Sequence, residues 1–111
     1  MSFLNTLAQK YEVNAAKIVT PTEWAKREVK DIKTQIDEEV GGVYLALMEM
    51  DRNQYDIEIE VSDGAIGGTY SDAGNLKKSR KAADDIEKVL KANGIKVFKT
   101  RSAWEKALYK D

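Results

Sequence analysis

Three acidic residues alternate with apolar ones in the segment Tyr55–Val61, YDIEIEV, and this spacing is the first in the chain that suits a functional site. Alternate side chains of an extended strand share a face, so we expect Asp56, Glu58 and Glu60 to form a row with about 7 Å between neighbours. Glu49 is expected opposite Asp56 on a preceding strand. The row suits a divalent cation or a basic partner protein, and it equally suits a solvated sheet face that resists aggregation. A catalytic metal site needs carboxylates that converge from different elements, which this spacing alone does not provide.

Basic residues are dense between residues 77 and 101, which is typical of a surface that binds nucleic acid. The residues expected to contact phosphates are Lys77, Lys78, Lys81 and Lys88. Acidic residues interrupt the same segment at helical spacing and form the four-residue pairs Lys81–Asp85, Asp84–Lys88 and Glu87–Lys91. A solvated helix face with internal ion pairs is therefore the competing interpretation.

Two further patterns in the middle of the chain resemble known sites incompletely. The segment Asp51–Asp56 has the start of a calcium loop, but Asp56 replaces the required glycine and Ser62 replaces the closing glutamate. Three glycines between residues 64 and 68 precede a predicted helix, as phosphate-binding loops do. Their spacing matches neither the dinucleotide fingerprint nor the P-loop, so tight turns are the expected use.

Residues 7–18, LAQKYEVNAAKI, resemble a helix-turn-helix segment of DNA-binding proteins. Ala8, Val13 and Ile18 stand where that motif wants small or apolar residues. A glutamate occupies the usual turn glycine, and Pro21 would shorten the recognition helix. The resemblance implies DNA binding and covers this short segment only.

The chain contains no histidine and no cysteine. This removes the commonest general base, the commonest metal ligand and the best thiol nucleophile. The same absences argue against zinc, haem and iron–sulfur sites, and the serines have no histidine as a base. We therefore expect no catalytic site and no cofactor, and an enzyme that uses carboxylates and a metal is the weakest of three hypotheses.

Periodicity predicts the elements that must position these residues. Apolar spacing predicts helices at 2–11, 21–40, 75–92 and 102–109, and strands at 43–50, 55–61 and 95–99, with a short additional strand at 65–70 left open. Capping boxes begin the second and last helices at Thr20 and Ser102. The order predicts one α+β domain over residues 1–111, with an antiparallel sheet and helices against one of its faces.

Residues 43–50 fit two structures. Apolar residues from Val29 to Met50 fall at three- and four-residue spacing, which favours a long helix, but that helix would contain Gly41 and Gly42 at a cost of roughly 2 kcal/mol. A hairpin with the loop 51–54 is therefore favoured. It would have an apolar face of Met50–Tyr55, Met48–Ile57, Ala46–Ile59 and Tyr44–Val61, and a mixed face of Glu49–Asp56, Leu47–Glu58 and Leu45–Glu60.

Composition indicates a folded chain with segregated charge. Of 111 residues, 42% are hydrophobic and 33% charged, and the net charge is −1. Residues 37–72 hold ten acidic residues and one arginine, whereas residues 73–111 hold eleven basic and five acidic residues. This asymmetry marks either an interaction surface or two segments that neutralise each other. No secretory signal or bilayer-spanning run is apparent, and the absence of cysteine suits a reducing compartment.

These observations predict a small cytoplasmic, non-enzymatic accessory or inhibitory domain, a monomer or dimer, that binds a partner protein through Glu49, Asp56, Glu58 and Glu60. The alternative is a nucleic-acid-binding protein that uses the basic segment 77–101. A phage or mobile-element origin is a further hypothesis, based on size alone. The sequence identifies neither the partner nor the process.

Overall fold

The computed structural model describes residues 19–109. The chain forms α2 (Pro21–Gln35), β1 (Gly42–Asp51), β2 (Gln54–Ser62), β3 (Ala65–Gly74), α3 (Leu76–Ala92), β4 (Lys96–Phe98) and α4 (Arg101–Leu108). The strands make one sheet in the order β3-β2-β1-β4. The predicted α+β class is confirmed. The predicted helix at 2–11 and the helix-turn-helix segment at 7–18 lie outside the described residues.

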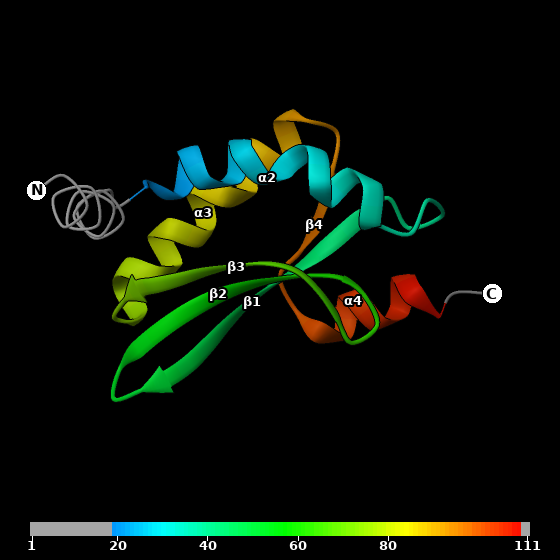
Figure 1. The fold of residues 1–111 in the computed structure, drawn as a ribbon. Coiled ribbons are helices and arrows are strands. Elements are labelled where there is room, and N and C mark those ends of the chain that lie inside the picture. Colours follow the sequence, from blue (N-terminus) through cyan, green and yellow to red (C-terminus); the bar gives the residue numbers. More distant parts are fainter. Residues whose placement is uncertain (1–18, 110–111) are drawn as a thin grey trace, which may run out of the picture.

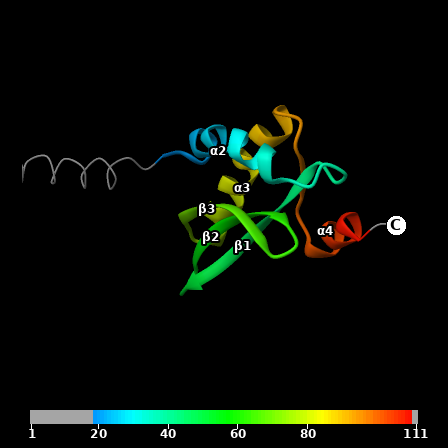
Figure 2. The same ribbon diagram turned by 45° about the vertical axis from the view of Figure 1, so that its right-hand side comes forward.

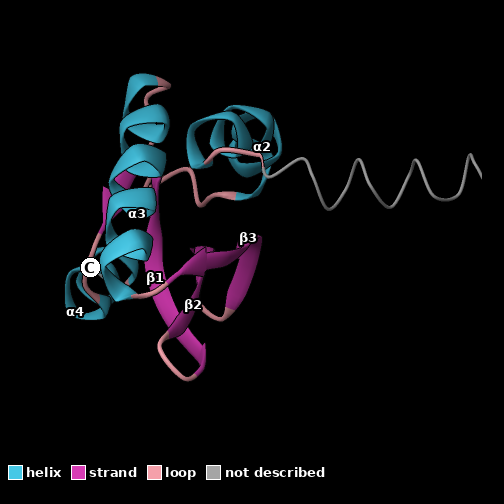
Figure 3. Cartoon of the chain, turned by 90° about the vertical axis from the view of Figure 1, so that its left-hand side faces the viewer, coloured by secondary structure: helices cyan, strands magenta, loops and turns pink. Residues whose placement is uncertain are grey.

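Helices cover both faces of the sheet, but unequally (Figures 1 and 2). α2 and α3 pack on the inner face and cross steeply, since Figure 3 shows α3 upright and α2 nearly end-on. α4 lies on the outer face, where Arg101 packs over the Tyr44 ring. The prediction that all helices pack against one face is therefore wrong for α4. Its N-cap is Thr100 rather than Ser102, so only two residues separate β4 from the helix. The chain passes around the sheet edge at these two residues.

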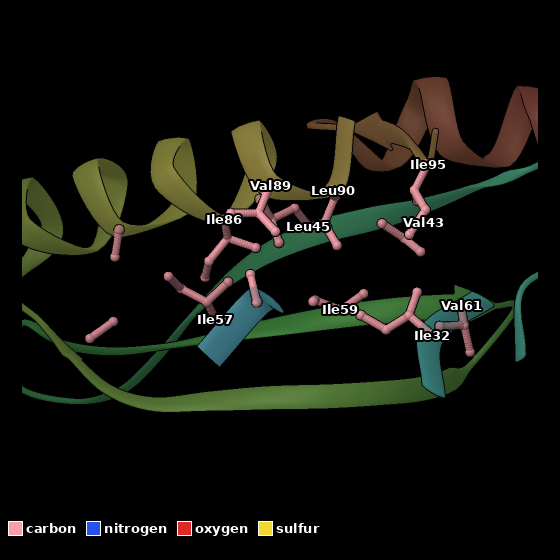
Figure 4. Packing of buried hydrophobic residues seen from close by; sticks show 13 residues of the cluster. Ile32, Val43, Leu45, Ile57, Ile59, Val61, Ile86, Val89, Leu90 and Ile95 are labelled. Atoms are coloured by element: carbon pink, nitrogen blue, oxygen red, sulfur yellow. The ribbon is translucent and has the colours of Figure 1, made fainter. Parts of the chain in front are cut away.

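The core lies between the inner face and the two crossing helices (Figure 4). Alternate residues of a strand point inward, and helix residues at three- and four-residue spacing share a face, so both patterns converge on one layer. Its buried members include Ile32 of α2, Val43 and Leu45 of β1, Ile57, Ile59 and Val61 of β2, Ile86, Val89 and Leu90 of α3, and Ile95 before β4.

Residues 43–50 form a strand, so the hairpin is confirmed and the long helix is wrong. The register, however, differs by one residue from the predicted one. The directly opposed pairs include Leu45–Ile59, Leu47–Ile57, Tyr44–Glu60, Ala46–Glu58 and Met48–Asp56. The inner face of β1 therefore carries Leu45 and Leu47, and Met48 is 40% exposed on the outer face.

The register shift originates at the turn. The predicted loop 51–54 is only two residues long, because β1 continues to Asp51 and β2 begins at Gln54. Asn53 adopts a left-handed backbone with φ 47, which asparagine tolerates better than most residues. The register shifts between Glu49 and Asp51, so the hairpin ends in a bulge. Asp51 opposite Gln54 still fits the predicted register, so the bulge between Glu49 and Asp51 alone exchanges the two faces of β1.

α2 ends at Gln35 and not at residue 40 as predicted. Ile36 is already extended, with φ −73 and ψ 152. The Asp37 carboxylate accepts hydrogen bonds from the N–H groups of Glu39 and Val40, at 2.8 and 3.3 Å. A short acidic side chain thus satisfies the backbone locally, which competes with continuation of the helix.

β4 pairs with β1 in parallel, so the sheet is mixed rather than antiparallel as predicted. The contact covers only Gly42–Tyr44 of β1. A Cβ on Gly42 would lie 2.6 Å from the carbonyl oxygen of Lys96, so glycine is required for this close approach. The remainder of β1 extends past the end of β4 (Figure 1).

Candidate functional site

The outer face of the sheet carries the predicted acidic row. Asp56, Glu58 and Glu60 oppose Met48, Ala46 and Tyr44 in turn, so all six residues share that face. Glu49 does not join the row, because it opposes Tyr55 and therefore lies on the inner side, where its carboxylate accepts a hydrogen bond from Asn53 N–H at 3.2 Å. The one-residue register shift accounts for this separation.

Glu60 lies at the end of the row that α4 covers, and it is only 4% exposed. Its carboxylate accepts hydrogen bonds from Arg101 Nη2 at 2.8 Å and from Gly64 N–H at 3.1 Å. The hydrogen bond to Glu60 raises the pKa of Arg101 further above its already high value. Arg101 also stacks 5.2 Å above the centre of the Tyr44 ring. Glu60 is therefore an internal ion partner that holds α4 on the sheet.

Trp104 anchors α4 at the same end of the outer face. Its side chain is fully buried, and its ring lies 5.5 Å from that of Phe98. Ala46, on the same outer face of β1, is only 7% exposed. The hydroxyl of Tyr109, after the helix, donates a hydrogen bond to the Asp63 carboxylate in the β2–β3 turn. This end of the outer face is closed.

The other end of the outer face is open, and we call Met48, Asp56, Glu58 and Thr69 the open acidic patch. Glu58 opposes Thr69 of β3, and Met48 opposes Asp56. Within residues 19–109, neither Asp56 nor Glu58 forms an ion pair. The Asp56 carboxylate accepts a hydrogen bond from Asp72 N–H at 3.0 Å, which fixes its position. The patch thus presents two partly exposed carboxylates beside an exposed methionine.

The acidic row is not arranged to hold a metal ion. In the described part of the chain, no three acidic side chains converge on one point. In the segment that resembled a calcium loop, the Asp51 carboxylate accepts a hydrogen bond from the adjacent Arg52 N–H at 2.7 Å. Of the three glycines at 64–68, Gly64 lies in the β2–β3 turn with φ 75, and Gly67 and Gly68 lie within β3. None of them forms a loop at the N-terminus of α3.

The basic helix α3 is partly neutralised by its own acidic residues. Lys81 pairs with Asp85 at 3.0 Å and Lys91 with Glu87 at 2.8 Å, as expected from the spacing. The predicted Asp84–Lys88 pair is absent, because Asp84 contacts Lys99 at 3.4 Å, and Lys99 also contacts Glu87 at 2.7 Å. Burial raises the pKa of Glu87, but the hydrogen bonds from Lys91 and Lys99 outweigh it and lower that pKa overall.

Three of the four lysines that are predicted to contact phosphates have exposed side chains. Lys77, Lys78 and Lys88 are exposed and form no ion pair within residues 19–109. Lys88 lines a shallow groove of about 270 Å³ between α2 and α3, and Lys26 of α2 lines the same groove. Sequence spacing alone does not connect Lys26 with α3, because nothing local shows that the two helices cross there.

Comparisons with protein-family models, with curated proteins and with solved structures each found no match. In the described residues, no helix is long and apolar enough to span a bilayer. The open acidic patch and the groove between α2 and α3 are the two candidate binding surfaces.

Proposed function

We propose that this protein is a non-enzymatic binding domain that docks on a basic surface of a partner protein through the open acidic patch. The observation that carries the proposal is the half-covered outer face. α4 covers the end with Glu60, whereas Asp56 and Glu58 remain partly exposed without an ion partner in the described chain. Unneutralised carboxylates at a fixed position favour a partner of opposite charge.

The neighbouring methionine favours a protein as that partner. Met48 is 40% exposed beside the carboxylates, and methionine is enriched in the cores of protein interfaces. The carboxylates would steer association with a basic surface, and the apolar side chain would lose its contact with water on docking. Strands already order the backbone of all these residues, so little backbone entropy is lost on binding. Docking without chemistry suits an accessory or inhibitory role.

Charge reversal of the patch should abolish partner capture. We expect the variant Asp56→Lys/Glu58→Lys to lose the protein that the tagged wild-type chain captures from a lysate of its source, because two like charges would then face the basic partner. The matched control is Glu38→Lys/Glu39→Lys, which makes the same charge change at two exposed residues between α2 and β1. The control should retain the captured protein in the presence of nuclease. Equal capture by the patch variant would refute the proposal, provided that circular dichroism shows a folded chain.

Nucleic-acid binding by the helical layer is the second candidate. The groove that Lys26 shares with Lys88 favours it, since α2 and α3 each contribute a lysine that forms no ion pair in the described chain, and the Asp85 carboxylate in the same groove is paired with Lys81. We expect duplex DNA of mixed sequence to bind with an affinity that falls as salt rises. Replacement of Lys88 by glutamine should lower the slope of log affinity against log salt by about 0.9, whereas Lys106→Gln, on α4 at the other face, should leave it unchanged. Fluorescence anisotropy across a salt series measures both slopes, and undetectable or salt-independent binding removes this candidate.

A further inference from the structure

β1 has a free edge beyond the end of β4. β4 pairs only with Gly42–Tyr44, and within residues 19–109 no strand pairs with the segment Leu45–Asp51 on that side. Figure 1 shows β4 at the start of β1, and the arrowhead of β1 lies well beyond it. A strand edge that is left open in this way is a template for pairing with another strand.

Backbone groups of alternate residues point to this edge. The Lys96 N–H donates to Gly41 O at 3.0 Å, so the odd-numbered residues of β1 direct their N–H and C=O groups toward β4. By the same alternation, Leu47 and Glu49 direct theirs to the free edge. A strand that joined the sheet here would form hydrogen bonds with these two residues.

A groove with a surplus positive charge accompanies the free edge. It measures about 290 Å³ and lies on the inner side, between β1 and α3. Its lining residues are Leu45, Leu47, Arg80, Ala83, Asp84 and Lys99. Asp84 is held by Lys99 at 3.4 Å, whereas Arg80 forms no ion pair in the described chain. An incoming strand could place an apolar stem against the leucines of this groove and a carboxylate beside Arg80.

We propose that a second copy of this chain supplies that strand, paired antiparallel about a two-fold axis at Met48. The free segment runs from Leu45 to Asp51, so Met48 is its middle and the segment pairs with itself. Leu47 of each copy then faces Glu49 of the other, and the two Met48 residues oppose each other. β4 excludes any register centred closer to the start of β1, because its Phe98 already occupies the edge at Tyr44.

Two properties of β1 favour a second copy over another protein. Glu49 lies on the inner side of the sheet, so in the continued sheet it enters the groove of the other copy, next to Leu47 and within reach of Arg80. Met48, which is 40% exposed in the single chain, lies beside the same residue of the other copy on the outer face. The interface is isologous, so each contact occurs twice. The result is one continuous sheet of two chains.

A charge swap tests this proposal, which does not depend on the proposed function. Sedimentation equilibrium up to about 1 mM chain should show a reversible dimer of the wild type. Glu49→Arg and Arg80→Glu should each weaken it at least roughly tenfold, since each brings two like charges together. The double variant Glu49→Arg/Arg80→Glu should return the dissociation constant to within a few-fold of wild type.

Amide hydrogen exchange gives an independent readout. The amides of Leu47 and Glu49 should become protected as the chain concentration rises, and an amide in the middle of β2 should not change. Both substituted side chains are exposed, and circular dichroism checks that the variants fold. A wild type that stays monomeric overturns the proposal, as does a dimer that the single variants leave intact or the double variant fails to restore. Capture of a different protein at this edge by a monomeric chain likewise overturns it.

Discussion

Replacement of Trp104 by alanine should lower the free energy of unfolding by about 3–5 kcal/mol. The side chain is fully buried between α4 and the outer face, and its ring packs 5.5 Å from that of Phe98. α4 has eight residues, which is too short for a stable helix without tertiary contacts. Loss of the indole therefore removes both buried apolar area and the main attachment of the helix. Urea denaturation followed by circular dichroism measures the change in unfolding free energy.

Substitution of Tyr109, the C-cap residue of α4, is the matched control. Tyr109 directly follows the same helix and is 63% exposed, so Tyr109→Ala should change the unfolding free energy by less than about 1 kcal/mol. The Trp104 variant should also release Arg101 from Glu60, which would return a third carboxylate to the outer face. A loss below about 1 kcal/mol for Trp104→Ala would mean that α4 is not held on the sheet, and the division of the outer face into closed and open ends would fail with it.

Local sequence patterns were sufficient to predict the elements with strong periodicity. α3 was expected at 75–92 and spans Leu76–Ala92, with Asn75 as its N-cap and Asn93 and Gly94 at its end. The end of α2 was missed, because Asp37 offers the backbone a competing local turn that hydrophobic spacing does not reveal. The parallel pairing of β4 was missed for a different reason. β3, α3 and β4 follow one another as strand, helix and strand, an order typical of strands that run parallel, but the strand at 65–70 was left open.

The acidic row illustrates which part of a site the sequence determines. Alternation alone placed Asp56, Glu58 and Glu60 on one strand face. It did not show that Glu60 is neutralised, because its partner Arg101 is 41 positions away in the sequence. The exclusion of Glu49 depends on the hairpin register, which the bulge between Glu49 and Asp51 decides. Asn53, a residue tolerant of positive φ, was the one local signal for the tight turn.

Alanine substitutions in β1 should establish the register directly, because the two registers assign opposite faces to neighbouring residues. In the observed register Leu45 is 5% exposed against Ile59, so Leu45→Ala should cost about 2–5 kcal/mol of unfolding free energy through lost burial and the cavity left behind. Met48 is 40% exposed, so Met48→Ala should cost less than about 1 kcal/mol. Urea denaturation at low chain concentration measures both without any contribution from self-association. If Met48 instead opposed Ile57, Met48→Ala would lower the unfolding free energy more than Leu45→Ala. Because that register would also return Glu49 to the row of Asp56 and Glu58, this pair of variants decides which carboxylates form the open acidic patch and whether Glu49 is free to enter the groove of a second copy.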